Sequence, residues 1–140
     1  MEKTTKSFSL ADLDAAQAGS KAFEFEYLNE GTPTGIFFSV LGGQSEVVTA
    51  EVAKLVNERR HKQAIREAAK RTNGKKSTEF ETMESDVEFG QRLAAVRLVG
   101  WRGITEAFSA AGALHLCQSN RDIAVQIVEQ SDNVGNFIKL

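Results

Sequence analysis

Residues 22–41 contain two runs of strand-forming side chains separated by a turn, and this arrangement constrains the fold more than any other feature. In the first run, Phe23, Phe25 and Tyr27 alternate with glutamates, the period of two that a half-buried strand requires. The second run, GIFFSVL at residues 35–41, is apolar on both of its faces. The intervening NEGTPTG is rich in turn residues, so we expect a hairpin joined by a loop of several residues.

An isolated two-stranded hairpin is only marginally stable in water. This hairpin therefore needs helices or another subunit against its aromatic face. Because its second strand is apolar on both faces, that strand suits a position between two partners better than a solvent-exposed edge.

Four helices are predicted after the hairpin, at about residues 45–72, 85–99, 109–117 and 120–138. Their expected N-caps are Ser45, Ser85, Ser109 and Ser119, and two of these form capping boxes, Ser85 with Glu88 and Ser119 with Asp122. Residues 1–20 are expected to be partly mobile, with one short helix opened by Ser9 and Asp12. The predicted fold class is α+β, predominantly helical: a single domain at residues 21–140, with an N-terminal β-hairpin packed on about four α-helices.

The only tryptophan, Trp101, lies between two glycines in VGWRGITEAFS. Gly100 can end the preceding helix, and Ser109 can start the next one. We therefore expect Trp101 at the corner between these helices, with its ring covering both helix ends and its indole N–H reaching a free carbonyl. This structural role is favoured over that of a binding anchor.

The net charge of −2 favours neither nucleic acid nor anionic lipid, but the charges are segregated along the chain. Residues 59–76 are strongly basic, and residues 79–88 are acidic. One hypothesis is a nucleic-acid-binding protein that uses the basic helix 59–76 through Arg59, Arg60, Lys62, Arg66 and Lys70. The run lacks interleaved aromatic residues for base stacking, so we favour charge pairing within the chain or between subunits.

No group of residues in the sequence indicates catalysis. Cys117 and His115 are two positions apart, and on a helix such residues point to nearly opposite sides, so they do not form a nucleophile and base. A buried thiol is favoured for Cys117. His61 has no other ligand at the spacing of a metal site. We expect a protein that is not an enzyme and that binds no metal or cofactor.

The single cysteine excludes an internal disulfide, which favours a reducing cytoplasm. No apolar stretch approaches the roughly 20 residues that are needed to span a bilayer. A soluble protein without membrane association is therefore expected.

Several short motifs follow one another in order from about residue 8 to the end. They are Pro33-Thr34-Gly35 before an apolar strand, a link at residues 41–45 into a charged helix, Trp101 to Gly103, Phe108-Ser109 at a helix start, and Asn136-Phe137. This pattern resembles the tail-assembly chaperones of long-tailed (siphovirus-type) bacteriophages. Gln44 and Ala110 depart from it, because the family often has an acidic residue and a proline at these places.

The resemblance implies a non-enzymatic protein that binds the tape-measure protein, keeps that long hydrophobic helical chain soluble and helps recruit tail-tube subunits in the cytoplasm of the bacterial host. It also implies that a longer product commonly arises by frameshifting, in which case the chain ending at Leu140 is the shorter form. We expect a homo-oligomer formed through the hairpin. The predicted partner-binding residues are Phe37, Leu41, Val48, Leu55 and Val56, and the alternative is that they belong to the core, above all the three on the helix.

Overall fold

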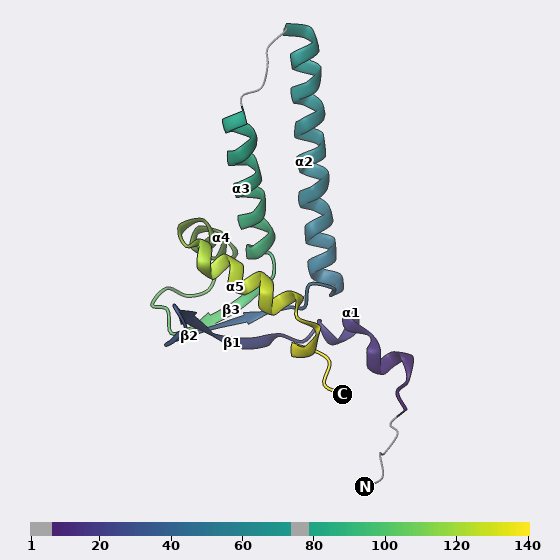
Figure 1. Ribbon diagram of the computed structural model, residues 1–140, viewed down its shortest axis with the longest axis vertical. Helices are drawn as coiled ribbons and strands as arrows, with labels where there is room; N and C mark the ends of the chain where they lie inside the picture. Colours follow the sequence, from purple (N-terminus) through teal and green to yellow (C-terminus); the bar gives the residue numbers. More distant parts are fainter. Residues whose placement is uncertain (1–6, 74–78) are drawn as a thin grey trace.

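The computed structural model describes residues 7–73 and 79–140, with side chains for residues 7–70 and 86–140. The chain is α+β and mostly helical, as predicted (Figure 1). Its elements are η1 (Leu10–Leu13), α1 (Ala15–Ala18), β1 (Phe23–Asn29), β2 (Thr32–Val40), α2 (Glu46–Asn73), α3 (Glu79–Ala95), β3 (Leu98–Arg102), α4 (Ala110–Ser119), α5 (Arg121–Asp132) and η2 (Val134–Asn136).

The three strands form one antiparallel sheet in the order β1-β2-β3, so β2 is its central strand. This confirms that the strand with two apolar faces lies between two partners. The predicted end of the second helix at residue 99, with Gly100 as its cap, is wrong, because α3 ends at Ala95 and β3 follows. Pairing of Ser39 with Gly100 in β3 satisfies backbone groups that β2 would otherwise leave open at its second edge.

The turn between β1 and β2 is tighter than the predicted loop of several residues. Asn29 pairs with Thr32, which leaves only Glu30 and Gly31 between the strands. Both have positive φ, 50° and 80°, as in the type I′ turn that matches the twist of a hairpin. Pro33 and the residues after it therefore belong to β2.

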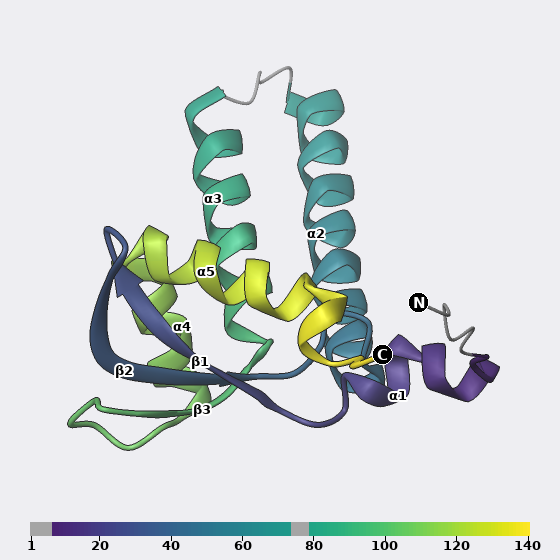
Figure 2. The same ribbon diagram turned by 60° about the horizontal axis from the view of Figure 1, so that its bottom comes forward.

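One face of the sheet carries the hydrophobic core. Its buried side chains are Phe25, Tyr27, Phe38, Val40 and Leu98. They pack against α4 and α5, which lie over this face (Figure 2) and contribute Ala113, Cys117, Ile123, Ala124 and Ile127. In the part of the chain that the structure describes, no helix covers the opposite face of the sheet.

Helices α2 and α3 rise side by side from the rest of the molecule as an arm (Figures 1 and 2). The 28 residues of α2 correspond to a length of about 42 Å. Its predicted cap is confirmed, because the buried Ser45 accepts a hydrogen bond from the N–H of Val48 at 3.3 Å. Its residues 61–69 are exposed, as expected of a segment that projects from the core. The predicted cap of α3 is wrong: the helix begins at Glu79, so Ser85 lies inside it.

The last two helices begin one after the other. Ser109 caps α4 as predicted, by accepting from the N–H of Gly112 at 2.9 Å. The cap predicted for α5 is shifted by one residue, because Asn120 accepts from the N–H of Ile123 at 3.1 Å and Ser119 ends α4. Asparagine therefore caps α5 at the position after the predicted serine, and these two residue types are about equally favourable as N-caps.

The helix predicted at residues 120–138 is too long. It ends at Asp132, and Asn133 caps the short η2, because its side chain can accept a local backbone hydrogen bond. The chain then turns back, and Phe137 packs edge-on against Phe23 with 6.0 Å between ring centroids. The C-terminal residues therefore cover the start of β1 instead of extending the helix.

Residues 7–20 contain the predicted short helix. The N–H of Ser9 donates to Asp12 at 2.9 Å, and the N–H of Asp12 donates to Ser9 at 3.4 Å, which completes the capping box of η1. Residues 1–6 of the segment predicted to be partly mobile lie outside the described residues.

Candidate interaction surfaces

The five predicted contact residues do not form one surface. Val48 and Leu55 are buried at the base of α2, with exposures of 0% and 7%, so in this conformation neither side chain can contact a partner. The alternative assignment to the core applies to these two. Val56 is half-buried on α2, and Phe37 and Leu41 are half-buried at the sheet.

Phe37 lies on the open face of the sheet, between Glu26 of β1 and Arg102 of β3. The guanidinium of Arg102 lies over the Phe37 ring, 3.8 Å from its centroid, and donates two hydrogen bonds to Glu24, at 2.8 and 3.1 Å. These hydrogen bonds, with the positive charge of Arg102, lower the pKa of Glu24. Val99 is 42% exposed on β3. This open face, the outer face of the sheet, thus combines the Phe37 ring with an ion pair.

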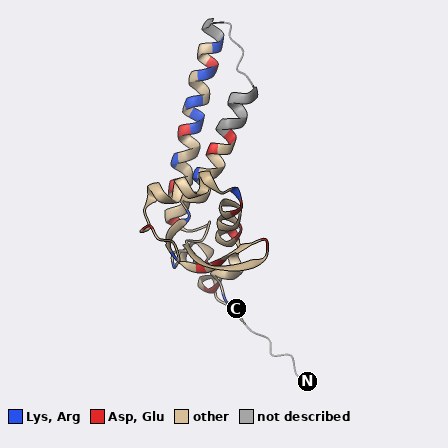
Figure 3. Ribbon diagram, turned by 90° about the vertical axis from the view of Figure 1, so that its left-hand side faces the viewer, with Lys and Arg blue, Asp and Glu red and all other residues tan. Residues whose placement is uncertain are grey.

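The predicted basic patch is partly neutralised within the arm (Figure 3). Arg59 of α2 pairs with Asp86 of α3, and its guanidinium lies 4.5 Å from the centroid of the Phe89 ring. Arg92 of α3 pairs with Glu58 of α2 at 3.1 Å. The predicted charge pairing is thus found at Arg59, as a pairing within the chain.

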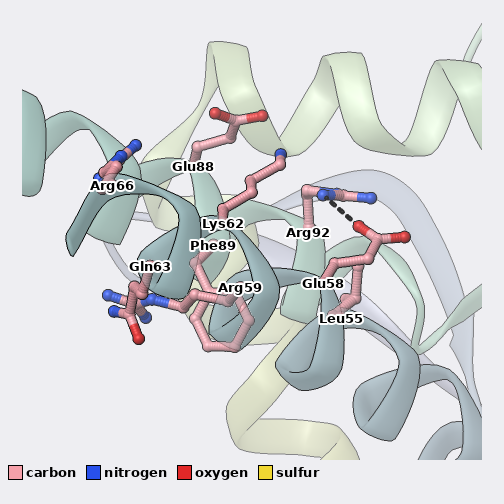
Figure 4. Close-up of a pocket in the computed structure, with 9 residues that line it drawn as sticks. All are labelled: Leu55, Glu58, Arg59, Lys62, Gln63, Arg66, Glu88, Phe89 and Arg92. Atoms are coloured by element: carbon pink, nitrogen blue, oxygen red, sulfur yellow. Dashed lines mark ion pairs between the residues drawn. The ribbon is translucent and has the colours of Figure 1, made fainter. Parts of the chain in front are cut away.

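The other predicted basic residues are spread over α2. Lys62 and Arg66 line a narrow cleft between α2 and α3 (Figure 4), together with Glu58 and Glu88. The cleft has a volume of about 30 Å³, room for about one water molecule, so it cannot hold a nucleotide. Arg60 is exposed, and Lys70 is half-buried; neither lines this cleft.

The side chains considered for catalysis are separated. Cys117 is fully buried, and burial raises the pKa of its thiol to about 11. His115 is exposed, and its backbone oxygen accepts from Ser119 at 2.7 Å. His61 is exposed on α2. Within residues 7–73 and 79–140, no three His, Cys, Asp or Glu side chains are grouped to hold a metal ion.

An apolar groove of about 440 Å³ lies between α3 and α5. Its floor is formed by Cys117 and Ala124, and its apolar walls by Val87 of α3 and by Val125 and Val128 of α5. Val87 and Val125 remain 43% and 46% exposed, so the groove opens to solvent. We call these residues, with the bordering Asp86, Gly90, Gln91, Arg121 and Glu129, the α3–α5 groove.

None of the predicted contact residues lines the α3–α5 groove. A signal was nevertheless present in α5, which has more apolar residues than one buried stripe needs. Ile123, Ala124 and Ile127 are buried in the core, whereas Val125 is exposed, and Val128, which also packs against the core, lines the groove with it. A helix with two apolar stripes has one of them available for a partner.

Comparisons of the chain with models of protein families, with curated proteins and with solved structures find no match. No helix of the described residues is long and apolar enough to cross a membrane. Among the described residues, the α3–α5 groove and the outer face of the sheet are surfaces that the fold leaves open to a partner.

Proposed function

We propose that the protein is a tail-assembly chaperone of a long-tailed bacteriophage. It self-associates, binds the tape-measure protein and helps recruit tail-tube subunits in the cytoplasm of the bacterial host. The resemblance of its motifs to this family, from about residue 8 to the end, supports the proposal. The single structural observation that carries it is the α3–α5 groove.

A chaperone for a long amphipathic helical chain needs open apolar surface rather than an enclosed catalytic pocket, and it needs contacts that can be released. A groove between two helices, walled by Val87 and Val125, suits the recognition of a helix by its apolar face. The modest exposed area of these side chains gives each contact a low affinity, and many copies on one long client raise the overall affinity.

The outer face of the sheet supports self-association. It lies away from the helices that form the groove, so one copy can hold a client and contact another copy at the same time (Figure 2). Phe37 supplies its apolar part. The ion pair between Arg102 and Glu24 on this face restricts the geometries that a second copy can adopt.

Co-purification tests the proposal. The chain is co-expressed with an affinity-tagged coiled-coil segment of the tape-measure protein from the same phage, and the tagged segment is recovered at physiological salt. We expect the chain to elute with the segment in more than one copy per segment. Recovery of the segment without the chain would refute the chaperone function.

Light scattering during size-exclusion chromatography tests self-association separately. The chain should be larger than a monomer at micromolar concentration, and Phe37→Ser should shift it toward the monomer. A strict monomer at this concentration would refute association through the sheet, although client binding could still be observed.

A further inference from the structure

The wall of the α3–α5 groove contains a glycine that the packing of the chain does not require. Gly90 is exposed in the interior of α3, and a Cβ added there would meet no heavy atom of the described residues within 4 Å outside the backbone of its own helix. Glycine destabilises the interior of a helix relative to alanine, because it leaves more conformational freedom to the unfolded chain. No described part of the chain occupies the space beside Gly90, but the missing side chain would let the backbone of another molecule approach α3 closely.

The residues that α5 contributes to the groove have the spacing of one helix face. Arg121, Ala124, Val125, Val128 and Glu129 follow at i, i+3, i+4, i+7 and i+8. The stripe from Arg121 to Glu129 is about 12 Å long, which corresponds to about two turns of a helix lying alongside. An extended strand would instead need an open sheet edge for its backbone hydrogen bonds.

The two ends of this stripe carry opposite charges. Arg121 and Glu129 are both exposed, and among the described residues neither takes part in an ion pair. The aliphatic side chains lie between them. The stripe is therefore complementary to a helix that carries a carboxylate, two turns of apolar residues and then a cation.

We propose that the α3–α5 groove docks one amphipathic α-helix of the client, which passes close over Gly90 and lies along α5 with a carboxylate at Arg121 and a cation at Glu129. This inference rests on the proposed function, because it identifies the surface and the chemistry with which the chaperone holds its client. A small apolar molecule suits the groove less well, since Val87 and Val125 remain open to solvent along its length.

Filling the groove provides the first test. Gly90→Leu places a side chain in the open space without meeting neighbouring atoms at its Cβ, so the variant should melt no lower than the native chain. Val125→Asp, at a position 46% exposed, is a second groove variant that should fold. Glu67→Leu adds the same side chain at an exposed position of α2 and serves as the matched control.

Two probes are used with the full chain. One is the tape-measure segment, and the other is a fluorescein-labelled synthetic helix of 18 residues or so, alanine-rich, with leucines along one face between a Glu and a Lys about two turns apart. Fluorescence anisotropy gives the dissociation constant of the peptide. Both groove variants should weaken binding of each probe about tenfold or more, whereas Glu67→Leu should leave it unchanged.

Exchanging the charge at one end tests the orientation. A second peptide has Lys at both ends, and Arg121→Glu gives the groove acidic residues at both ends. The native chain should prefer the Glu–Lys peptide about fivefold, and Arg121→Glu should prefer the Lys–Lys peptide by a similar factor. An unchanged preference would overturn the assignment of these two charges.

The outcomes separate this inference from the proposed function. Peptide binding that both groove variants abolish, without binding of the tape-measure segment, would support the docking site and refute the chaperone function. Binding of the tape-measure segment that survives both Gly90→Leu and Val125→Asp would overturn the docking site and leave the chaperone function standing. Failure of both probes to bind would overturn both.

Discussion

Replacing Trp101 with alanine should lower the free energy of unfolding by about 3 kcal/mol without altering the α3–α5 groove. Trp101 is half-buried on β3, opposite Phe38, and it does not lie in the groove. Its ring packs edge-on against Phe108 with 5.0 Å between centroids. It also contacts the first turn of α4, where a Cβ on Gly112 would lie 3.2 Å from the ring.

The magnitude follows from these contacts. A fully buried Trp→Ala change costs about 3–5 kcal/mol, and partial exposure of Trp101 places it at the lower end. Within that figure, the edge-on aromatic pair contributes about 1 kcal/mol. The indole N–H donates to the backbone oxygen of Glu106 at 2.8 Å, which contributes about another 1 kcal/mol. The expected fall in melting temperature is about 10 °C.

Thermal and urea denaturation followed by far-ultraviolet circular dichroism measures the change, since removing the only tryptophan removes the fluorescence signal. Trp101→Phe is the control: it keeps an aromatic ring but loses the N–H, so it should cost about 1 kcal/mol. Client binding by folded Trp101→Ala should equal that of the native chain. A melting temperature within about 2 °C of the native value, together with lost client binding, would make Trp101 a binding anchor and refute its structural role.

Three further predictions concern the sheet, the core and the arm. Gly103→Ala should lower stability by about 2 kcal/mol or more in urea denaturation, because Gly103 has φ 87° and its added Cβ would lie 2.4 Å from the oxygen of Gly35. Gly31→Asn is the control, at a turn position where an added Cβ meets no described atom, and it should cost little stability. Equal losses in the two variants would show that the close contact at Gly103 does not matter. Burial raises the pKa of Cys117 from 9.0 to about 11, so the folded thiol stays protonated where the unfolded thiol ionises. The free energy of unfolding should fall as pH rises from 9.0 to about 11, and Cys117→Ala should lack this part of the pH dependence. The same pH dependence in both proteins would refute the raised pKa of the buried thiol. The arm should bind duplex DNA or RNA only weakly at physiological salt, because Arg59 and Arg92 are paired with carboxylates. Tight binding that falls steeply with added salt, and that is lost in the double variant Arg60→Ser/Arg66→Ser, would instead favour a nucleic-acid-binding protein.

The elements with strong local signals could be predicted from the sequence. Alternation of Phe23, Phe25 and Tyr27 with glutamates identified the first strand, and Ser45 and Ser109 identified two helix starts, because each depends on neighbours in sequence. The apolar faces of β2 also predicted its place between two partners. These features depend on the periodicity of apolar residues and on the identity of capping residues, and both can be recognised in the sequence alone.

The third strand could not be predicted in the same way. Leu98 and Val99 lie at the end of the predicted helix, and only the pairing of residues 98–102 with β2, far away in sequence, makes them a strand. Trp101 consequently lies in a sheet and not at a corner between helices. It still covers the first turn of α4 and donates its N–H, although to the backbone oxygen of Glu106, which is not a helix end.

The α3–α5 groove could not be predicted because it depends on how two helices are placed. Val87 and Val125 are 38 positions apart, and nothing local to either indicates that they wall the same groove. Apolar residues chosen from sequence, such as Val48 and Leu55, proved to be buried instead. Hydrophobicity identifies residues that leave water, but the fold decides whether the partner is the core or another protein.

The solubility of a co-expressed client tests the central claim most directly. The tape-measure protein is expressed with the native chain, with the groove variant Val87→Asp and Val125→Asp, or with Val134→Asp, a control at a position 41% exposed outside the groove. The client should be in the soluble fraction with the native chain and with the control, and in the pellet with the groove variant, provided that circular dichroism shows each variant to be folded. A client that stays insoluble with the native chain, or that is equally soluble with the folded groove variant, would contradict the claim that this protein holds its client in the α3–α5 groove.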